Sequence, residues 1–79
     1  MALVKKYFAV NKDDVRVHEG VECGYTVFDS SGQRYLQLDT YGSADRAIPG
    51  KVSQSLQFDY ASASELRHLI DRFFPENRA

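Results

Sequence analysis

The last third of the chain carries an apolar pattern with the period of an α-helix. Large apolar residues recur at positions i, i+3, i+4, i+7 and i+8, namely Leu66, Leu69, Ile70, Phe73 and Phe74. This spacing predicts an amphipathic helix over residues 60–74. Asp59 can cap its first turn, Ser62 and Glu65 form an alternative capping box, and Pro75 ends it. A helix with one apolar side needs a second apolar surface to cover, so the rest of the chain must provide one.

Two runs that precede this helix alternate with the period of a β-strand. They are QRYLQLDTY at residues 33–41 and VSQSLQFD at residues 52–59. The alternation gives each run an inner side that contains its apolar residues: Leu36, Leu38 and Thr40 in the first run, and Val52, Gln54, Leu56 and Phe58 in the second. Because the outer sides are polar, we expect an antiparallel sheet with one face covered and the other open to water.

Further strands are expected before these two runs. Residues 5–10 contain Tyr7, Phe8 and Val10 and predict a first strand, followed by a turn at residues 11–14. Residues 15–18 and 21–28 also predict strands, in a hairpin, and the DSSG sequence at residues 29–32 predicts a turn.

The sequence therefore predicts an α+β fold, with an antiparallel sheet of four to five strands and one C-terminal amphipathic helix packed on one face. Residues 1–79 form a single domain: residues 1–12 are an N-terminal lead or first strand, residues 15–58 the sheet and residues 60–74 the helix. A chain of 79 residues is near the size at which one core stabilises a fold only marginally. Pairing with a second copy or a partner chain would add burial.

Enzyme chemistry is not expected from this sequence. Cys23 and His18 lack a third orienting group at a recognisable spacing, and with His68 they do not form a metal-ligand pattern. The residues around Gly50 and Lys51 do not fit a phosphate-binding loop. We expect no catalytic residue, no metal and no cofactor.

Composition and charge narrow the class of partner. A hydrophobic fraction of 43% without a long apolar run predicts a globular chain with no membrane span, and a single cysteine fits the reducing cytoplasm. The net charge is −1, and residues 13–32 hold five acids. A uniformly basic surface for duplex DNA is absent, so any nucleic-acid binding must come from a local patch.

The outer side of the two alternating runs is such a candidate patch. It contains aromatic, amide and hydroxyl side chains with cations at its edges: Tyr35, Gln37, Tyr41, Ser53, Ser55 and Gln57, with Arg34, Arg46 and Lys51. Unpaired bases stack on aromatic rings, amides and hydroxyls hydrogen-bond to them, and cations contact phosphates. The alternative is an ordinary solvated sheet face, where tyrosine is common because aromatic residues favour strands.

The connection between the two runs, residues 42–51, is also a candidate. It is longer than the two to five residues of ordinary hairpin loops and contains Arg46 and Lys51. These cations can simply keep the loop soluble, or the loop can reach over a nucleic-acid strand.

Residues 34–74, with IPGKVSQSLQFD followed by SASELRHLIDRFF, resemble the positive-cofactor-four type of transcriptional coactivator domain and its bacterial and phage relatives. The resemblance implies a homodimer with the C-terminal helices at its interface and grooves for single-stranded or melted DNA. It implies contacts from Arg46 and Lys51 in the hairpin and from strand residues Tyr35, Gln37 and Ser53.

Two functions remain open at this point. The first is a nucleic-acid-binding module, favouring single-stranded DNA, with a role in transcription or DNA processing. The alternative is a protein-interaction module, such as a phage or mobile-element inhibitor or an adaptor, because short acidic proteins can occupy the basic grooves of a target.

Overall fold

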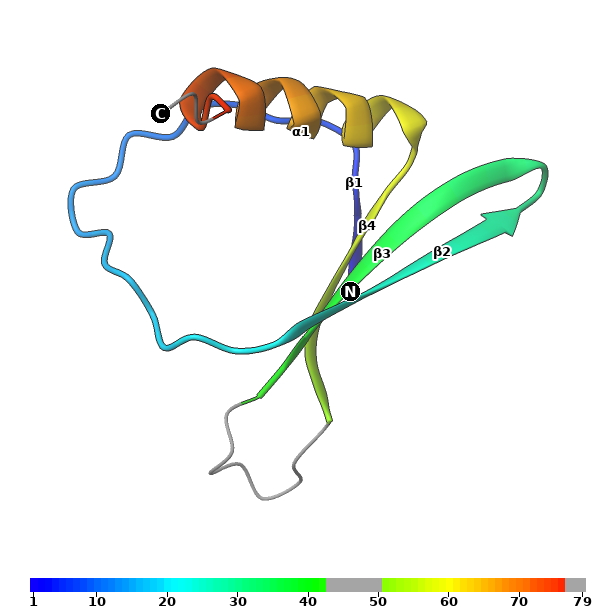
Figure 1. Cartoon of the computed structure of the whole chain (residues 1–79), viewed down its shortest axis with the longest axis horizontal. Coiled ribbons are helices and arrows are strands. Elements are labelled where there is room, and N and C mark those ends of the chain that lie inside the picture. Colours follow the sequence, from blue (N-terminus) through cyan, green and yellow to red (C-terminus); the bar gives the residue numbers. More distant parts are fainter. Residues whose placement is uncertain (43–50, 77–79) are drawn as a thin grey trace.

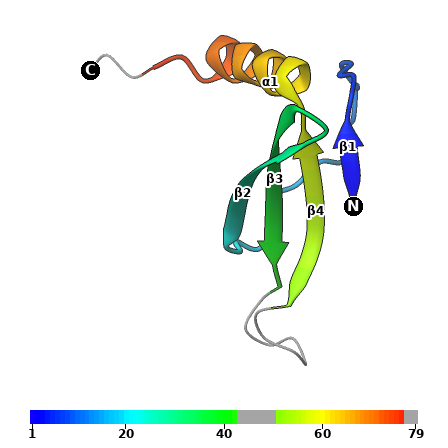
Figure 2. The same ribbon diagram turned by 90° about the vertical axis from the view of Figure 1, so that its right-hand side faces the viewer.

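A computed structural model of the chain describes residues 1–42 and 51–76 as a four-stranded sheet and one C-terminal helix (Figure 1). The elements follow the order β1 (Ala2–Val4), β2 (Cys23–Ser30), β3 (Gln33–Tyr41), β4 (Val52–Phe58) and α1 (Tyr60–Phe73). The strands lie side by side in the order β1-β4-β3-β2 (Figure 2). The predicted α+β class is confirmed.

Strands β2 and β3 form a hairpin with a two-residue turn. Both turn residues have positive φ, 51° at Ser31 and 78° at Gly32. This is the backbone of a type I′ turn, whose twist matches that of the flanking strands. The turn fixes the register, so that Val27 lies opposite Leu36 and Phe28 opposite Tyr35.

The first strand is not where the sequence predicts it, and it runs in the other direction. β1 comprises Ala2–Val4 rather than residues 5–10, and it pairs parallel with β4. The sheet is therefore mixed, with antiparallel pairing between β2, β3 and β4. A short strand of three residues has no periodicity to detect, and its partner is more than fifty positions away at Leu56.

Residues 5–22, here named the arm, contain neither helix nor strand. The strand predicted at residues 15–18 is thus wrong, and the hairpin predicted with it is replaced by β2 and β3. Strand propensity depends strongly on context: β1 and β3 occupy the two edges of β4, and residues 15–18 join no strand. The arm makes a wide curve from α1 to β2 (Figure 1), and all of its residues except Tyr7 are exposed.

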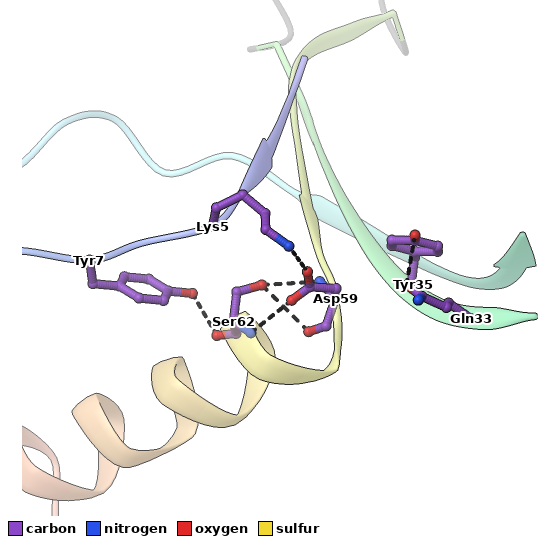
Figure 3. A network of polar contacts seen from close by, with 6 residues as sticks. All are labelled: Lys5, Tyr7, Gln33, Tyr35, Asp59 and Ser62. Atoms are coloured by element: carbon purple, nitrogen blue, oxygen red, sulfur yellow. Dashed lines mark hydrogen bonds and ion pairs between the residues drawn. The ribbon is translucent and has the colours of Figure 1, made fainter. Parts of the chain in front are cut away.

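Both ends of the arm are tied to the rest of the fold. Lys5 Nζ donates a hydrogen bond to the carboxylate of Asp59 in an ion pair, and the Tyr7 hydroxyl donates to the Ser62 carbonyl at 2.8 Å (Figure 3). Partial burial raises the pKa of the Tyr7 phenol. At the other end, the N–H of Tyr41 donates to the Glu22 carbonyl at 3.0 Å.

The α1 helix begins at a complete capping box formed by Asp59 and Ser62 (Figure 3). The Asp59 carboxylate accepts from the Ser62 N–H at 2.9 Å, and the Ser62 hydroxyl accepts from the Asp59 N–H at 3.0 Å. Of the two starts predicted from the sequence, the structure uses Asp59, so Glu65 is not part of the cap. The helix ends at Phe73, and Pro75 follows the C-cap residue.

The sheet has two faces of different chemistry, because side chains alternate along each strand and paired residues share a side. The apolar face is formed by Tyr25, Val27, Leu36, Leu38, Leu56 and Phe58. The polar face is formed by Thr26, Phe28, Tyr35, Gln37, Asp39, Ser55 and Gln57.

The helix lies over one end of the apolar face. Ala63 and Arg67 of α1 line a shallow groove there with Val27, Leu36 and Phe58. Within residues 1–42 and 51–76, Phe58 is the only buried large apolar side chain. The helix crosses the end of the strands and extends to one side of them in both views (Figures 1 and 2). Its cover of the sheet is therefore partial. No helix in the described ranges is long and apolar enough to cross a membrane.

Candidate nucleic-acid interface

A row of hydrogen-bonded polar side chains runs across the middle of the polar face. The Gln57 amide donates to Gln37 Oε1 at 2.8 Å, and the Gln37 amide donates to Asp39 Oδ1 at 3.0 Å. The Ser55 hydroxyl donates to the same Asp39 oxygen. These contacts link β3 to β4 and hold the four side chains in fixed positions.

Asp39 carries a negative charge at the centre of this row. Hydrogen bonds from Ser55 and then Gln37 lower the pKa of its carboxyl group, because both stabilise the ionised form. The hydrogen bonds within the row use only part of the donors and acceptors of its side chains. A carboxylate has about four lone-pair sites, and an amide has two N–H donors. The row therefore retains capacity to bind the polar edge of a planar ligand.

An aromatic pair lies beside the row, towards the β2–β3 turn. The rings of Phe28 and Tyr35 stack with centroids 5.4 Å apart and an angle of 21° between their planes. The Tyr35 hydroxyl donates to Gln33 Oε1 at 3.2 Å (Figure 3). Both rings are half-buried. Together they present a flat, rigid surface next to hydrogen-bonding groups.

Tyr41 lies at the other end of β3, and its ring lies against Gly24 of β2. A Cβ atom at Gly24 would approach Tyr41 Cε2 to 3.3 Å, so the absence of a side chain there makes room for the ring. Ser53 falls at an irregularity in the β3–β4 pairing, because Thr40 pairs with Gln54 and Tyr41 with Val52. These two predicted site residues flank the row rather than join it.

Of the predicted cations in the described residues, Arg34 does not lie on the polar face. Arg34 has the same alternation phase as Leu36 and forms an ion pair with Asp29 at 3.1 Å, on the side of the apolar face. Lys51 is exposed just before β4. Arg46, with most of the predicted loop, lies outside the described residues. The structure thus brings together Tyr35, Gln37, Ser55 and Gln57, and it separates Arg34 from them.

Cys23 and His18, which the sequence analysis considers for catalysis and metal binding, lie in different kinds of segment. Cys23 is exposed at the start of β2, whereas His18 is in the arm rather than in a strand. In the described part of the chain, no three histidine, cysteine or acidic side chains gather to hold a metal ion.

Three members of the polar face, Thr26, Phe28 and Asp39, are not among the site residues predicted from the sequence. Phe28 is out of phase with Tyr25 and Val27 in the β2 alternation, which is a signal that it faces the other side. Asp39 was placed on the outer side of its strand, but its role as the centre of the row depends on the register that brings Ser55 opposite it.

Comparison of the chain with models of protein families, with curated proteins and with solved structures finds no match. The resemblance to the positive-cofactor-four type of domain therefore stays a prediction from residues 34–74.

Proposed function

We propose that this chain is a small nucleic-acid-binding module that binds single-stranded or melted DNA on its polar sheet face. We place it in the bacterial cytoplasm, as a protein of bacterial or phage origin. Its proposed role is in transcription or DNA processing. In this proposal the module works as a homodimer, without a cofactor and without catalytic activity of its own.

The observation that carries the proposal is the position of the Phe28–Tyr35 pair beside the Gln57–Gln37–Asp39–Ser55 row. An aromatic surface next to fixed hydrogen-bonding groups suits an unpaired base, which stacks on one and is bound along its edge by the other. A paired duplex hides both the base face and its Watson–Crick edge.

The charge on Asp39 sets the orientation of the ligand. A carboxylate at the centre of the face repels phosphate but accepts hydrogen bonds from base amino groups. The proposal therefore places bases over the row and the phosphate backbone at the margin, where Lys51 and Arg46 supply positive charge. Arg34 is assigned no contact, since its ion pair with Asp29 is on the other side of the sheet.

The test is fluorescence anisotropy of a labelled single-stranded oligonucleotide, and of the duplex with the same sequence, at several salt concentrations. We expect micromolar or tighter binding to the single strand, with affinity that falls as salt rises. Because stacking of a base on an aromatic ring contributes about 1–3 kcal/mol, Tyr35→Ala should weaken binding by roughly 5- to 100-fold.

Tyr60→Ala provides the matched control, because Tyr60 is an exposed tyrosine on α1 and is not a member of the polar face. It should bind as the unsubstituted chain does. Lys51→Ala and Arg46→Ala should each weaken binding and reduce its salt dependence. Equal loss in Tyr35→Ala and Tyr60→Ala, or no binding at low salt, would reject the proposal.

The exposed arm favours one alternative function. Its residues 13–22 carry four acids, Asp13, Asp14, Glu19 and Glu22, against one cation, Arg16, and the arm contacts the fold mainly at its two ends. An acidic segment of this kind suits docking into a basic groove of another protein. Absence of oligonucleotide binding, together with a protein partner whose affinity falls when the four acids are replaced by amides, would support this alternative.

A further inference from the structure

The apolar sheet face is largely uncovered beyond the end that α1 occupies. Tyr25 is 76% exposed, and Val27 and Leu56 are each about half-exposed. Next to this face, at the turn, the charges of Arg34 and Asp29 compensate each other. A contiguous apolar surface of this kind on a small chain marks an interaction site.

The helix presents a second uncovered apolar surface on the same chain. Ile70, Phe73 and Phe74 belong to the apolar stripe predicted from the sequence, and Phe73 and Phe74 are 65% and 76% exposed. Ile70 and Phe73 lie in the second half of α1, here called its far half, which extends past the strands, and Phe74 follows directly (Figure 1). The start of α1 is held by the capping box and by Tyr7, so its own far half cannot fold back over the sheet while these contacts persist.

The total surface is much larger than expected for a lone chain. A compact monomer of 9.0 kDa has an accessible surface of about 4,900 Å², whereas this chain has 7249 Å². Its radius of gyration is 15.2 Å, against about 12 Å for a compact domain of this length. The exposed arm contributes to this excess together with the uncovered apolar surfaces, and the excess is larger than the roughly 800 Å² that each partner buries in a standard interface.

From these observations we propose that a second copy of the chain covers both surfaces by reciprocal exchange. The far half of α1 from one copy packs on the apolar sheet face of the other, and the same contact recurs across a two-fold axis. This differs from the helix-to-helix interface that the family resemblance implies, and it does not depend on nucleic-acid binding.

Size and chemistry support a second copy as the occupant. The far half of α1, about seven of its 14 residues, spans about 10 Å, and the seven residues of β4 span about 23 Å, so the far half fits along the sheet. Both surfaces are apolar, and both are present in every copy, so the interface is self-complementary. The polar face stays outside this contact.

The experiment measures mass by light scattering over a range of concentrations, with folding checked by circular dichroism. The unsubstituted chain should have twice the 9.0 kDa chain mass. Two single substitutions at highly exposed positions test the two surfaces: Phe73→Asp on the helix and Tyr25→Lys on the sheet. Each variant alone should be a monomer.

Mixing the two variants distinguishes the proposed exchange from other dimers. In a heterodimer, the intact helix of Tyr25→Lys meets the intact sheet of Phe73→Asp, so one contact of the pair is fully restored. The mixture should therefore recover a dimer. The controls are His68→Asp on the outer side of α1 and Thr26→Lys on the polar face, and both should remain dimeric.

Three results would overturn the inference. The first is a monomeric unsubstituted chain at every concentration. The second is a dimeric Tyr25→Lys variant beside a monomeric Phe73→Asp variant, since this indicates contact between helices alone. The third is a mixture that stays monomeric although both variants are folded. A monomeric chain would also remove the homodimer from the proposed function. None of these results depends on whether the polar face binds DNA, so dimerisation and DNA binding are tested separately.

Discussion

The serine hydroxyl in the capping box permits a sharp test of what holds α1 in place. Ser62 is 1% exposed, and its hydroxyl accepts from the Asp59 N–H at 3.0 Å. Ser62→Ala removes this acceptor and leaves a partly buried N–H without it, at a cost of about 1–2 kcal/mol. The higher helix propensity of alanine stabilises α1 by at most about 0.5 kcal/mol. The net loss should be about 1 kcal/mol.

Ser64→Ala is the matched control, because it makes the same substitution two positions further along the same helix, outside the cap. It should gain the propensity of alanine without losing the cap, and stabilise the fold by up to about 0.5 kcal/mol. The two variants should therefore shift stability in opposite directions, although their composition is identical.

The assay is thermal unfolding followed by circular dichroism at one fixed protein concentration, because an oligomer makes the melting temperature depend on concentration. For a chain of this size, 1 kcal/mol corresponds to about 4–8 °C. Ser62→Ala should melt lower than the unsubstituted chain and Ser64→Ala slightly higher. If both variants shift equally, the capping box contributes nothing specific and the reasoning is refuted.

Two further predictions concern the stability of the fold at low pH and the conformation of the hairpin turn. Hydrogen bonds from Lys5 and from the Ser62 N–H lower the pKa of Asp59 to about 2, so its stabilising effect is complete above its ordinary pKa of 3.8 and is lost as the pH falls towards 2. Urea midpoints at pH 5 and pH 2.5 should differ less in Asp59→Asn than in the unsubstituted chain, and an equal difference would contradict this. Gly32 has φ of 78°, so Gly32→Ala should destabilise the fold by about 1 kcal/mol in urea, whereas Gly20→Ala in the arm should have almost no effect. Similar midpoints for the two alanine variants would show that the turn is not strained.

The elements that could be predicted from the sequence are those with their own periodicity. The run at residues 33–41 coincides with β3, residues 52–58 with β4, and the helix predicted at residues 60–74 with α1 within one residue. In each case several residues repeat the same signal. β1 has three residues and is defined by its pairing with β4, so no local pattern could reveal it. Residues 15–18 show the converse, since they alternate but pair with no strand.

The same distinction applies to the candidate site. Alternation alone places Tyr35 and Gln37 on one side of β3, and Ser55 and Gln57 on the matching side of β4. It also places Arg34 on the opposite side, although the sequence prediction had treated that residue as an edge contact. The central position of Asp39 depends on the lateral register between strands, which is set by tertiary pairing rather than by either strand.

The parallel pairing of β1 with β4 also constrains the order in which the chain can fold. The β2–β3 hairpin joins residues that are close in sequence, whereas Ala2 pairs with Leu56 and Lys5 with Asp59. Contacts between such distant positions require closure of a long loop and form slowly. During synthesis, β1 leaves the ribosome before any other strand but must remain unpaired until β4 has emerged. The first of the four strands in chain order is therefore the last to gain its partner, and in that interval it is exposed to proteases and to other unfolded chains.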